Sequence, residues 1–360
     1  MKIVFWQNVL SIHQESLLVE LGKYIDVWLI YEQEIYESRK KMGWSIPDFN
    51  GIKLISIDTI EDSIEDLLLT ISSDYHIFSG INVYKYISVY FNIFYKKNPS
   101  RIISFLEKPG SHTIGVKSFF RELKYRFYAK KYKDLKFILT PGGESYFLNV
   151  GFKRKKIIPF GYYGPDNVNI ENKEKNNIQV IKFIYVGSLI KLKNVSLLIN
   201  ALSKVKSENW ILDIIGDGIE RISLEKLTSS LNLTGKITFK GYKSNTNTKI
   251  YIKNADCLCL PSLYDGWGYV VNEAYSYGCS VICSDACGVS SLVSQSETSS
   301  VFKSDIVESL TSCIDKSIEQ HTSEQINTLK NITFYKNNLS GECGATKLLN
   351  LLAIVKENEQ

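Results

Sequence analysis

Short apolar stretches alternate with helical stretches along this chain, and the whole alternation occurs twice. In the first half, stretches typical of strands lie at 2–6, 27–31, 52–57, 75–80, 101–107 and 135–143. In the second half they lie at 181–188, 210–218, 237–241, 256–262 and 280–285. Buried strands that are separated by helices are typical of parallel sheets covered on both faces. The sequence therefore predicts an α/β fold with two doubly wound, Rossmann-like domains.

Helical stretches fill the intervals between these strands. They lie at 15–21, 61–71, 83–96 and 117–133, and then at 195–206, 222–233, 247–255 and 269–278. Residues 156–167 are interpreted as the exit from the first sheet, and the polar, Asn-rich stretch that follows it as a surface linker.

The domain organisation follows from this pattern. We predict a first domain over 1–165, a linker over 166–179 and a second domain over 180–335. Residues 336–360 are predicted to be helical and to pack back on the first domain. Two such domains in tandem would face each other across a cleft, with ligands at the carboxyl ends of the strands.

Charge is distributed unevenly along the 360 residues, whose net charge is +5. Residues 1–84 carry 6 Lys/Arg and 13 Asp/Glu, residues 85–165 carry 17 and 4, and residues 166–360 carry 20 and 21. A basic block inside a protein of small net charge indicates a local anionic partner rather than general nucleic-acid binding. No apolar stretch reaches 18 residues, so no membrane span is expected, and the first residues do not resemble a signal peptide.

The seven cysteines are an odd number and accompany no secretory signal. We therefore expect thiols in a reducing cytoplasm rather than a disulfide framework. Cys279, Cys283 and Cys287 are evenly spaced, but they lie in a predicted strand and turn without histidine partners, so no metal site is expected there.

Two loops that follow strands of the second domain carry candidate ligand-binding groups. In the stretch VGSLIKLKN, Gly187 permits a tight turn, and Lys193 can place a positive charge near a phosphate. In the stretch IIGDG, Gly216 and Asp217 form a second tight turn. The alternative interpretations are a surface lysine at a helix start and a plain turn.

A third loop, after the strand at 256–262, carries two acids, Asp265 and Glu273. A glycine-containing turn and the start of a predicted helix lie between them, with Gly266, Trp267, Gly268, Tyr269 and Val270. The N–H groups and dipole of a helix start favour a phosphate, and a carboxylate one turn further on can accept hydrogen bonds from a ribose diol. Asp265 would then accept a hydroxyl of a sugar. The alternative is a loop acid and a solvated helix charge.

These residues make the second domain similar to the family-four retaining glycosyltransferases, which have the GT-B fold. The family signature is an acid, seven residues and then Glu-Ala, and it corresponds here to Asp265 and Glu273-Ala274, with Gly278 and SVICSD after them. The stretch GSLIKLKN resembles a second motif, in which Lys193 stands at the phosphate-binding position. The GDG turn and the FKGY strand end match as well. The resemblance is strong over 180–290 and extends over the whole chain in outline.

The resemblance implies that the domain over 1–165 binds the acceptor and that the domain over 180–335 binds a nucleotide diphosphate sugar as the donor. It implies donor-binding roles for Gly187, Ser188, Lys193, Gly216, Asp217, Gly241, Asp265, Gly266, Trp267, Gly268, Tyr269, Val270 and Glu273, of which Lys193, Asp265 and Glu273 would also be catalytic. The N-terminal stretch FWQNVLSIHQ is similar to that of family members from bacterial surface-polysaccharide clusters.

The sequence departs from the family pattern at several positions. Asp265 replaces the more usual Glu, Ser188 replaces an Arg beside the diphosphate, and Asn194 replaces a Gly. The catalytic His of the first domain corresponds best to His112, with Glu107 as a second candidate.

No two aspartates in the chain are separated by one residue, so the sequence has no DxD pair to hold a divalent metal against a diphosphate. The resemblance implies a transferase that needs neither metal nor cofactor, because a helix dipole and Lys193 would neutralise the leaving group.

The basic block includes the predicted helix at 117–133, in which Tyr125, Tyr128 and Tyr132 share one face. One interpretation is an interfacial helix on anionic lipid near a lipid-linked acceptor. Its basic residues would be Lys124, Arg126, Lys130, Lys131 and Lys133. The other interpretation is an aromatic face in the core with a solvated charged back.

The sequence thus predicts a retaining, metal-independent glycosyltransferase at the cytoplasmic face of the cell membrane. It would move a sugar from a nucleotide diphosphate to a glycan or lipid-linked acceptor. The alternatives are a non-catalytic nucleotide-sugar-binding subunit, which the loss of Arg at position 188 would permit, and a GT-B sugar-nucleotide epimerase.

Overall fold

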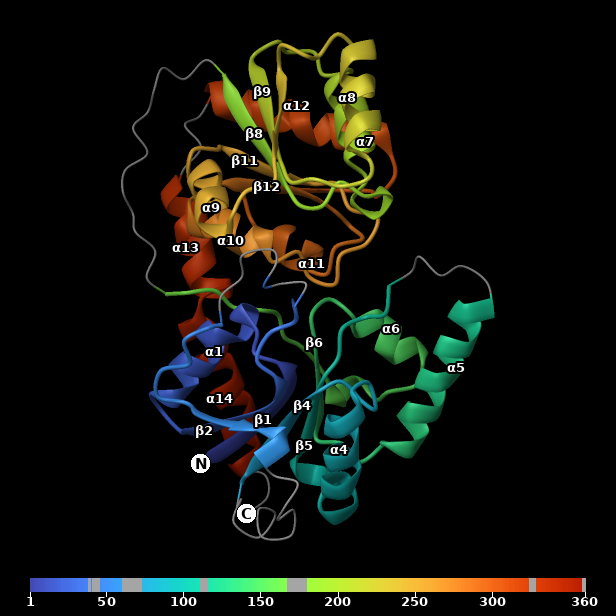
Figure 1. Cartoon of the computed structure of the whole chain (residues 1–360), viewed down its shortest axis with the longest axis vertical. Helices are drawn as coiled ribbons and strands as arrows, with labels where there is room; N and C mark the ends of the chain where they lie inside the picture. Colours follow the sequence, from blue (N-terminus) through green and yellow to red (C-terminus); the bar gives the residue numbers. More distant parts are fainter. Residues whose placement is uncertain are drawn as a thin grey trace. The chain divides into compact units, whose positions relative to one another are not determined.

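The computed structural model describes residues 1–37, 40, 46–59, 73–110, 116–166, 180–323 and 328–357. These residues form two compact units, each built around one parallel sheet (Figure 1). Unit 1 comprises Met1–Asp166 and Leu339–Gln360, and unit 2 comprises Asn167–Asn338. The α/β fold with two parallel sheets that the sequence predicts is confirmed.

The sheet of unit 1 has the strand order β3-β2-β1-β4-β5-β6-β7. Its strands are β1 (Lys2–Val9), β2 (Asp26–Gln33), β3 (Lys53–Ser56), β4 (Tyr75–Ser79), β5 (Ile102–Phe105), β6 (Phe137–Thr140) and β7 (Ile157–Pro159). Every pair is parallel, and the order turns back between β1 and β4, the kind of switch point outside which ligands bind in open α/β sheets.

The helices of unit 1 cover both faces of this sheet. They are α1 (Ile12–Gly22), α4 (Lys85–Lys97), α5 (Val116–Lys131), α6 (Glu144–Asn149) and α14 (Gly341–Glu357). Short 3₁₀ turns lie at η1 (Ile57–Thr59), η2 (Pro99–Arg101) and η3 (Arg154–Lys156). Alternate residues of the central strands enter two separate cores, one beneath α4 and α5 and one beneath α1 and α14.

The last helix of the chain completes the second of these cores. Ala345, Leu348 and Leu352 of α14 are fully buried beside Leu17, Leu18 and Leu21 of α1. Figure 1 shows α14 in red against the blue helix α1, although more than 300 residues separate them in the sequence. Unit 1 is therefore built from both ends of the printed sequence.

A buried histidine links the first core to the sheet. The indole Nε1 of Trp6 donates to Nδ1 of His76 at 3.1 Å, and Nε2 of His76 lies 2.7 Å from Oγ of Ser73. Because indole can only donate, Nδ1 must be the acceptor, so Nε2 carries the proton and donates to Ser73. Burial, together with the charge of Arg101, lowers the pKa of His76 to about 3. This histidine is neutral in the folded protein at ordinary pH.

The sheet of unit 2 has the strand order β10-β9-β8-β11-β12-β13, again with parallel pairs. Its strands are β8 (Ile181–Val186), β9 (Trp210–Ile215), β10 (Ile237–Gly241), β11 (Cys257–Leu260), β12 (Ser280–Ser284) and β13 (Ser300–Phe302). Around them lie η4 (Lys191–Lys193), α7 (Val195–Leu202), α8 (Arg221–Ser230), α9 (Asn245–Lys253), α10 (Val270–Ser276), α11 (Ser290–Val293), α12 (Val307–Ser323) and α13 (Thr328–Asn338).

Some predicted elements differ from the observed ones. The predicted exit at 156–167 contains strand β7, and β13, α6, α11 and α12 had no counterpart in the sequence prediction. The helix predicted at 269–278 is the shorter α10, and the one predicted at 195–206 ends at Leu202. The predicted helix at 61–71 and nearly all of the predicted linker lie outside the described residues.

Among the described helices, none has both the length and the apolar character that crossing a bilayer requires.

Candidate functional site

Three glycine-containing loops of unit 2 interlock at the carboxyl ends of β8, β9 and β10. The N–H of Gly187 donates to the carbonyl of Ile215, and the N–H of Gly216 donates to that of Gly241. A Cβ on Gly216 would lie 1.9 Å from the carbonyl oxygen of Gly187, and its φ of 134° also favours glycine. The backbones of these loops thus touch where a side chain could not fit, so the predicted residues Gly187, Gly216 and Gly241 lie together.

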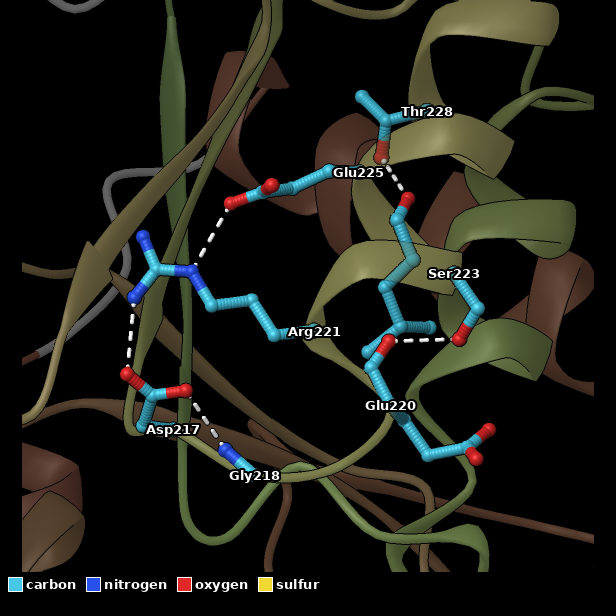
Figure 2. A network of polar contacts seen from close by, with 8 residues as sticks. Asp217, Gly218, Glu220, Arg221, Ser223, Glu225 and Thr228 are labelled. Atoms are coloured by element: carbon cyan, nitrogen blue, oxygen red, sulfur yellow. Dashed lines mark hydrogen bonds and ion pairs between the residues drawn. The ribbon is translucent and has the colours of Figure 1, made fainter.

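An ion network stands beside these loops (Figure 2). Asp217 accepts from the N–H of Gly218 at 2.8 Å and from Nη1 of Arg221 at 3.0 Å, while Nε of Arg221 donates to Glu225 at 2.9 Å. The hydrogen bond from Gly218, followed by that from Arg221, lowers the pKa of Asp217. Nη1 of Arg221 also lies 3.2 Å from the position of a Cβ on Gly241. The network therefore joins the GDG turn to α8 and to the end of β10.

Lys193 and Asp265, which the sequence assigns to different parts of one ligand, form an ion pair. Nζ of Lys193 lies 2.6 Å from Oδ2 of Asp265, and both side chains are mostly buried. The Asp265 backbone is fixed as well, because its carbonyl accepts from the N–H of Gly288 and it bridges to Cys287. The loop after β8 and the loop after β11 are thus brought together at this pair.

The loop between Asp265 and α10 folds around a buried tryptophan. The side chain of Trp267 is 9% exposed, and its Nε1 donates to Oδ1 of Asn272 at 2.9 Å. Gly268 has a φ of 94°, and a Cβ there would meet Leu260 at 2.8 Å. The buried indole therefore packs against this loop and stabilises it. Tyr269 is the N-cap residue of α10, and its side chain makes no capping hydrogen bond.

Glu273 lies in the first turn of α10 and is half-buried. Its surroundings raise the pKa of its carboxyl group, mainly by burial, while the charge of Lys249 acts in the opposite direction. Within the part of the chain that the structure describes, no donor is hydrogen-bonded to this carboxylate. A desolvated acceptor without a partner is unfavourable by itself and favourable for a ligand that brings hydroxyl groups.

The remaining predicted donor residues lie in the same loops. Ser188 is exposed and its carbonyl accepts from the hydroxyl of Tyr185 at 2.9 Å, while Gly266 and Val270 flank the buried Trp267 and the start of α10. Among the described residues, no group of three or more His, Cys, Asp or Glu side chains could hold a metal ion.

The two candidates in unit 1 have different outcomes. His112 lies outside the described residues. Glu107 is exposed after β5, and its carboxylate accepts from the hydroxyl of Tyr162. The catalytic residue of this unit thus remains a prediction.

The predicted basic helix is α5, and its tyrosines belong to the core. Tyr128 and Tyr132 are buried and Tyr125 packs against the same cluster, so the interfacial interpretation of the tyrosine face is wrong. Lys124, Lys130, Lys131 and Lys133 are exposed. Arg126 is exposed as well but forms an ion pair with Glu122 at 2.7 Å.

Sequence reasoning missed several residues of the site. Arg221 follows Asp217 at the i, i+4 spacing of a helical ion pair, and this spacing could have indicated the contact between them. Asn272, which holds the indole of Trp267, and Lys249, which faces Glu273, gave no signal, because their roles depend on contacts between separate elements.

Comparison with known proteins gives a consistent picture. Residues 168–327 match the family model described as glycosyl transferases group 1. The N-acetylgalactosamine-N,N'-diacetylbacillosaminyl-diphospho-undecaprenol 4-alpha-N-acetylgalactosaminyltransferase of Campylobacter jejuni is 32% identical over 126 residues, which are 34% of each chain. The lipopolysaccharide core biosynthesis glycosyltransferase LpsD of Rhizobium meliloti is 34% identical over 105 residues, which are 29% of each. The matched segment therefore spans only about a third of such relatives.

Solved structures match over nearly the whole chain. The Anabaena protein HepE in complex with UDP has a TM-score of 0.71 at 15% identity, covering 98% of this chain and 100% of that one. The lipopolysaccharide outer core galactosyltransferase WaaB has a TM-score of 0.70 at 17% identity, covering 98% and 99%. At such low identity these likenesses show the fold alone. Residues 168–327 therefore resemble the group 1 glycosyl transferases, and the chain has the GT-B fold of these solved structures.

Proposed function

We propose that this protein transfers a sugar from a nucleotide diphosphate sugar to a hydroxyl group of a growing, lipid-linked surface polysaccharide. The observation that carries the proposal is the Glu273 carboxylate, which is half-buried and has no hydrogen-bonded partner among the described residues. It belongs to the same unit as the three interlocked glycine loops. The names of relatives support it, since they include a transferase that acts on a diphospho-undecaprenol-linked sugar and one of lipopolysaccharide core biosynthesis.

Each part of the donor has a matching group in unit 2. The ribose hydroxyls would donate to Glu273, and the diphosphate would lie at the start of α10, close to Lys193. In the structure Lys193 is paired with Asp265. When the diphosphate binds, Lys193 would exchange the carboxylate for a phosphate oxygen, and Asp265 would become available to a hydroxyl of the transferred sugar.

The transfer proceeds with retention at the anomeric carbon. The bond from this carbon to the diphosphate oxygen breaks, and the acceptor oxygen forms its new bond on the same face. The acceptor proton passes to an oxygen of the leaving diphosphate, so no nucleophilic side chain is required. Lys193 and the N–H groups at the start of α10 would stabilise the leaving charge.

Ser188 leaves one positive charge fewer beside the diphosphate than the family pattern has. Arg221 is a cation beside the GDG turn, although Asp217 and Glu225 already neutralise it. We therefore assign Arg221 to positioning of the GDG turn rather than to the diphosphate.

The experiment that tests the proposal combines donor binding with turnover. A thermal-shift screen with UDP-, GDP- and dTDP-sugars should raise Tm for one base, and that donor should then be slowly hydrolysed without acceptor. Donor binding without hydrolysis or transfer would mean a binding subunit, and conversion of the free donor into its epimer would mean an epimerase. If no nucleotide sugar raises Tm, the proposal is wrong.

Metal independence is a separate prediction, which rests on the missing DxD pair and on Lys193. Transfer should continue at an unchanged rate after EDTA treatment, as measured by release of the nucleoside diphosphate. Activity that EDTA abolishes and Mn²⁺ restores would contradict this part of the proposal.

A lipid-linked acceptor would place the reaction at the cytoplasmic face of the cell membrane. The net positive charge of residues 85–165 supports this placement, since the lipids of that face carry negative charge.

A further inference from the structure

The outer side of helix α5 exposes large apolar side chains. Phe119, Phe120, Leu123 and Phe127 are 65%, 62%, 51% and 58% exposed, and we call these residues the apolar stripe. Phe120, Leu123 and Phe127 recur at intervals of three and four residues, so they share one side of the helix. Tyr128 and Tyr132 occupy the opposite side and are buried. The helix is thus apolar on both sides, whereas an ordinary surface helix has a polar outer face.

Lysines border the apolar stripe. Lys124, Lys130 and Lys131 are exposed on the same helix, and Nζ of Lys131 lies 5.9 Å from the centre of the Phe127 ring. Glu122 is engaged by Arg126 and therefore does not neutralise these lysines. An exposed apolar surface of this kind marks a binding site more often than a solvated face.

A second basic segment continues this surface. In Figure 1, α5 and α6 lie side by side at the edge of unit 1, and Gly151 beyond α6 comes close to Ala129 of α5. A groove of about 790 Å³ lies between α5 and the residues that follow α6, and it is lined by Phe120, Leu123, Phe127, Val150, Lys124 and Lys130 among others. The run from Lys153 to Lys156 follows, and Nζ of Lys156 donates to the carbonyl of Leu135 just after α5.

The cations of this region are close enough to repel one another. Burial lowers the pKa of Lys156, the charge of Asp134 acts in the opposite direction, and the charges of Lys153, Lys155 and Lys136 lower the pKa further. An anionic partner would relieve this repulsion. Few partners offer dense negative charge directly beside an apolar layer, as the headgroup region of a bilayer does.

We propose that the outer face of α5 docks on an anionic lipid bilayer, with the apolar stripe inserted among the headgroups and the lysines on their phosphates. This surface differs from the one suggested by the tyrosine pattern, since the inserted residues are Phe and Leu and the tyrosines anchor the helix to its own core. The proposal uses unit 1 alone, and it rests on the proposed function only in that a lipid-linked acceptor would lie at such a surface.

Vesicle sedimentation of the full chain tests the proposal. With vesicles of phosphatidylglycerol and phosphatidylcholine in equal parts, the protein should sediment at about 0.05 M salt and be largely released at about 0.5 M. It should stay in the supernatant with phosphatidylcholine alone. Failure to bind the anionic vesicles at low salt would overturn the proposal.

Two variants separate the apolar from the electrostatic contribution. Leu123→Gln with Phe127→Gln keeps every charge and should weaken vesicle binding by about tenfold, because exposed apolar area is lost. Its matched control is Ile250→Gln with Leu329→Gln, which removes two exposed apolar side chains of unit 2 and should leave binding unchanged. Equal binding by the two double variants would contradict insertion.

Lys124→Gln, Lys130→Gln, Lys131→Gln and Lys133→Gln together should weaken low-salt binding by more than about tenfold. The matched control is the same change at Lys206, Lys226, Lys303 and Lys316, four exposed lysines of unit 2. All variants should keep the wild-type Tm, because the altered side chains are exposed.

Two further measurements distinguish a failure of the proposed function from a failure of the docking surface. The Tm shift caused by the donor should persist in the α5 variants. If wild type binds vesicles but no donor, the proposed function is wrong and the docking surface is supported. If wild type binds the donor but no vesicles, only the docking surface is wrong. Light scattering that shows a dimer dissociated by the Leu123 and Phe127 changes would assign the apolar stripe to a second copy and overturn the lipid proposal.

Discussion

The Glu273 carboxylate carries a negative charge that its surroundings do not balance. Burial raises its pKa, so the ionised form is less favourable in the folded protein than in the unfolded chain. The folded state therefore holds its proton more tightly, and the charge of Glu273 lowers stability at neutral pH. A charge that lowers stability in this way is expected for a group that serves a ligand.

Glu273→Gln is expected to change stability and binding in opposite directions. Tm at pH 7 should rise, because a desolvated charge is removed. Donor affinity should fall by about tenfold or more, because charge-assisted hydrogen bonds contribute about 1.5–3 kcal/mol each. Calorimetric titration and thermal unfolding measure the two effects, and Glu297→Gln on the surface of the same unit is the control. A variant with unchanged donor affinity would remove Glu273 from the site.

The pH dependence of donor binding should report the same residue. Since its pKa is raised, the carboxylate protonates at a higher pH than the ordinary 4.5 of glutamate, and donor affinity should decline from there as pH falls.

His76 predicts a pH dependence of stability. Its pKa is about 3 in the folded protein and about 6.5 when unfolded, so unfolding between these values takes up a proton. Its contribution is complete above pH 6.5 and is lost as pH falls towards 3. The free energy of unfolding, measured with urea, should therefore fall below pH 6.5 more steeply in wild type than in His76→Gln. Parallel curves would mean that folding leaves the pKa of His76 unchanged.

At the scale of elements, the interlocked loops of unit 2 depend on glycine. Gly216→Ala places a Cβ against the carbonyl of Gly187 at a φ that L-residues avoid. We expect it to lower the unfolding free energy of unit 2 by several kcal/mol and to abolish donor binding, as the Tm with and without donor would show. Gly235→Ala is the control, because a Cβ there meets nothing within 4 Å. Similar Tm values for the two variants would contradict the close approach.

The strands with long apolar stretches could be predicted because a parallel sheet buries both faces, so its strands stand out from the polar loops. The strands β7 and β13 have three residues each, too few to show a period, and they are held by pairing with β6 and β12. The loops that carry Lys193, Asp265 and Glu273 were predicted from glycines and helix starts. The ion pair between Lys193 and Asp265 could not be predicted from the sequence, because the two residues are 72 positions apart and only the fold brings them together.

The same limit applies to α5. Its tyrosine spacing correctly predicted one apolar face, but periodicity does not say whether such a face meets protein or lipid. The tyrosines turn towards Phe147 and Phe91, and the less regular phenylalanines face outward.

At the scale of the whole molecule, the contribution of α14 to unit 1 can be tested. Leu348→Ala removes a fully buried side chain beside α1, and it should lower the unfolding free energy of unit 1 by about 2–5 kcal/mol. Fluorescence follows Trp6 and Trp28 of unit 1 together with Trp210 and Trp267 of unit 2. The donor-induced Tm shift reports on unit 2 alone and should remain. Lys347→Ala on the exposed side of the same helix is the control. Equal effects of the two changes would show that α14 contributes little to this core.

The position of α14 also determines the order in which the two units can fold during synthesis on the ribosome. Unit 2 is one continuous segment and can close its core once residue 338 has emerged. Unit 1 begins to emerge first, but it lacks one side of its core until residues 341–357 follow, tens of seconds later at about 5–20 residues per second. During that interval the part of α1 that packs on α14 has no partner, so the earlier-made half of the chain is the one that chaperones would hold longest.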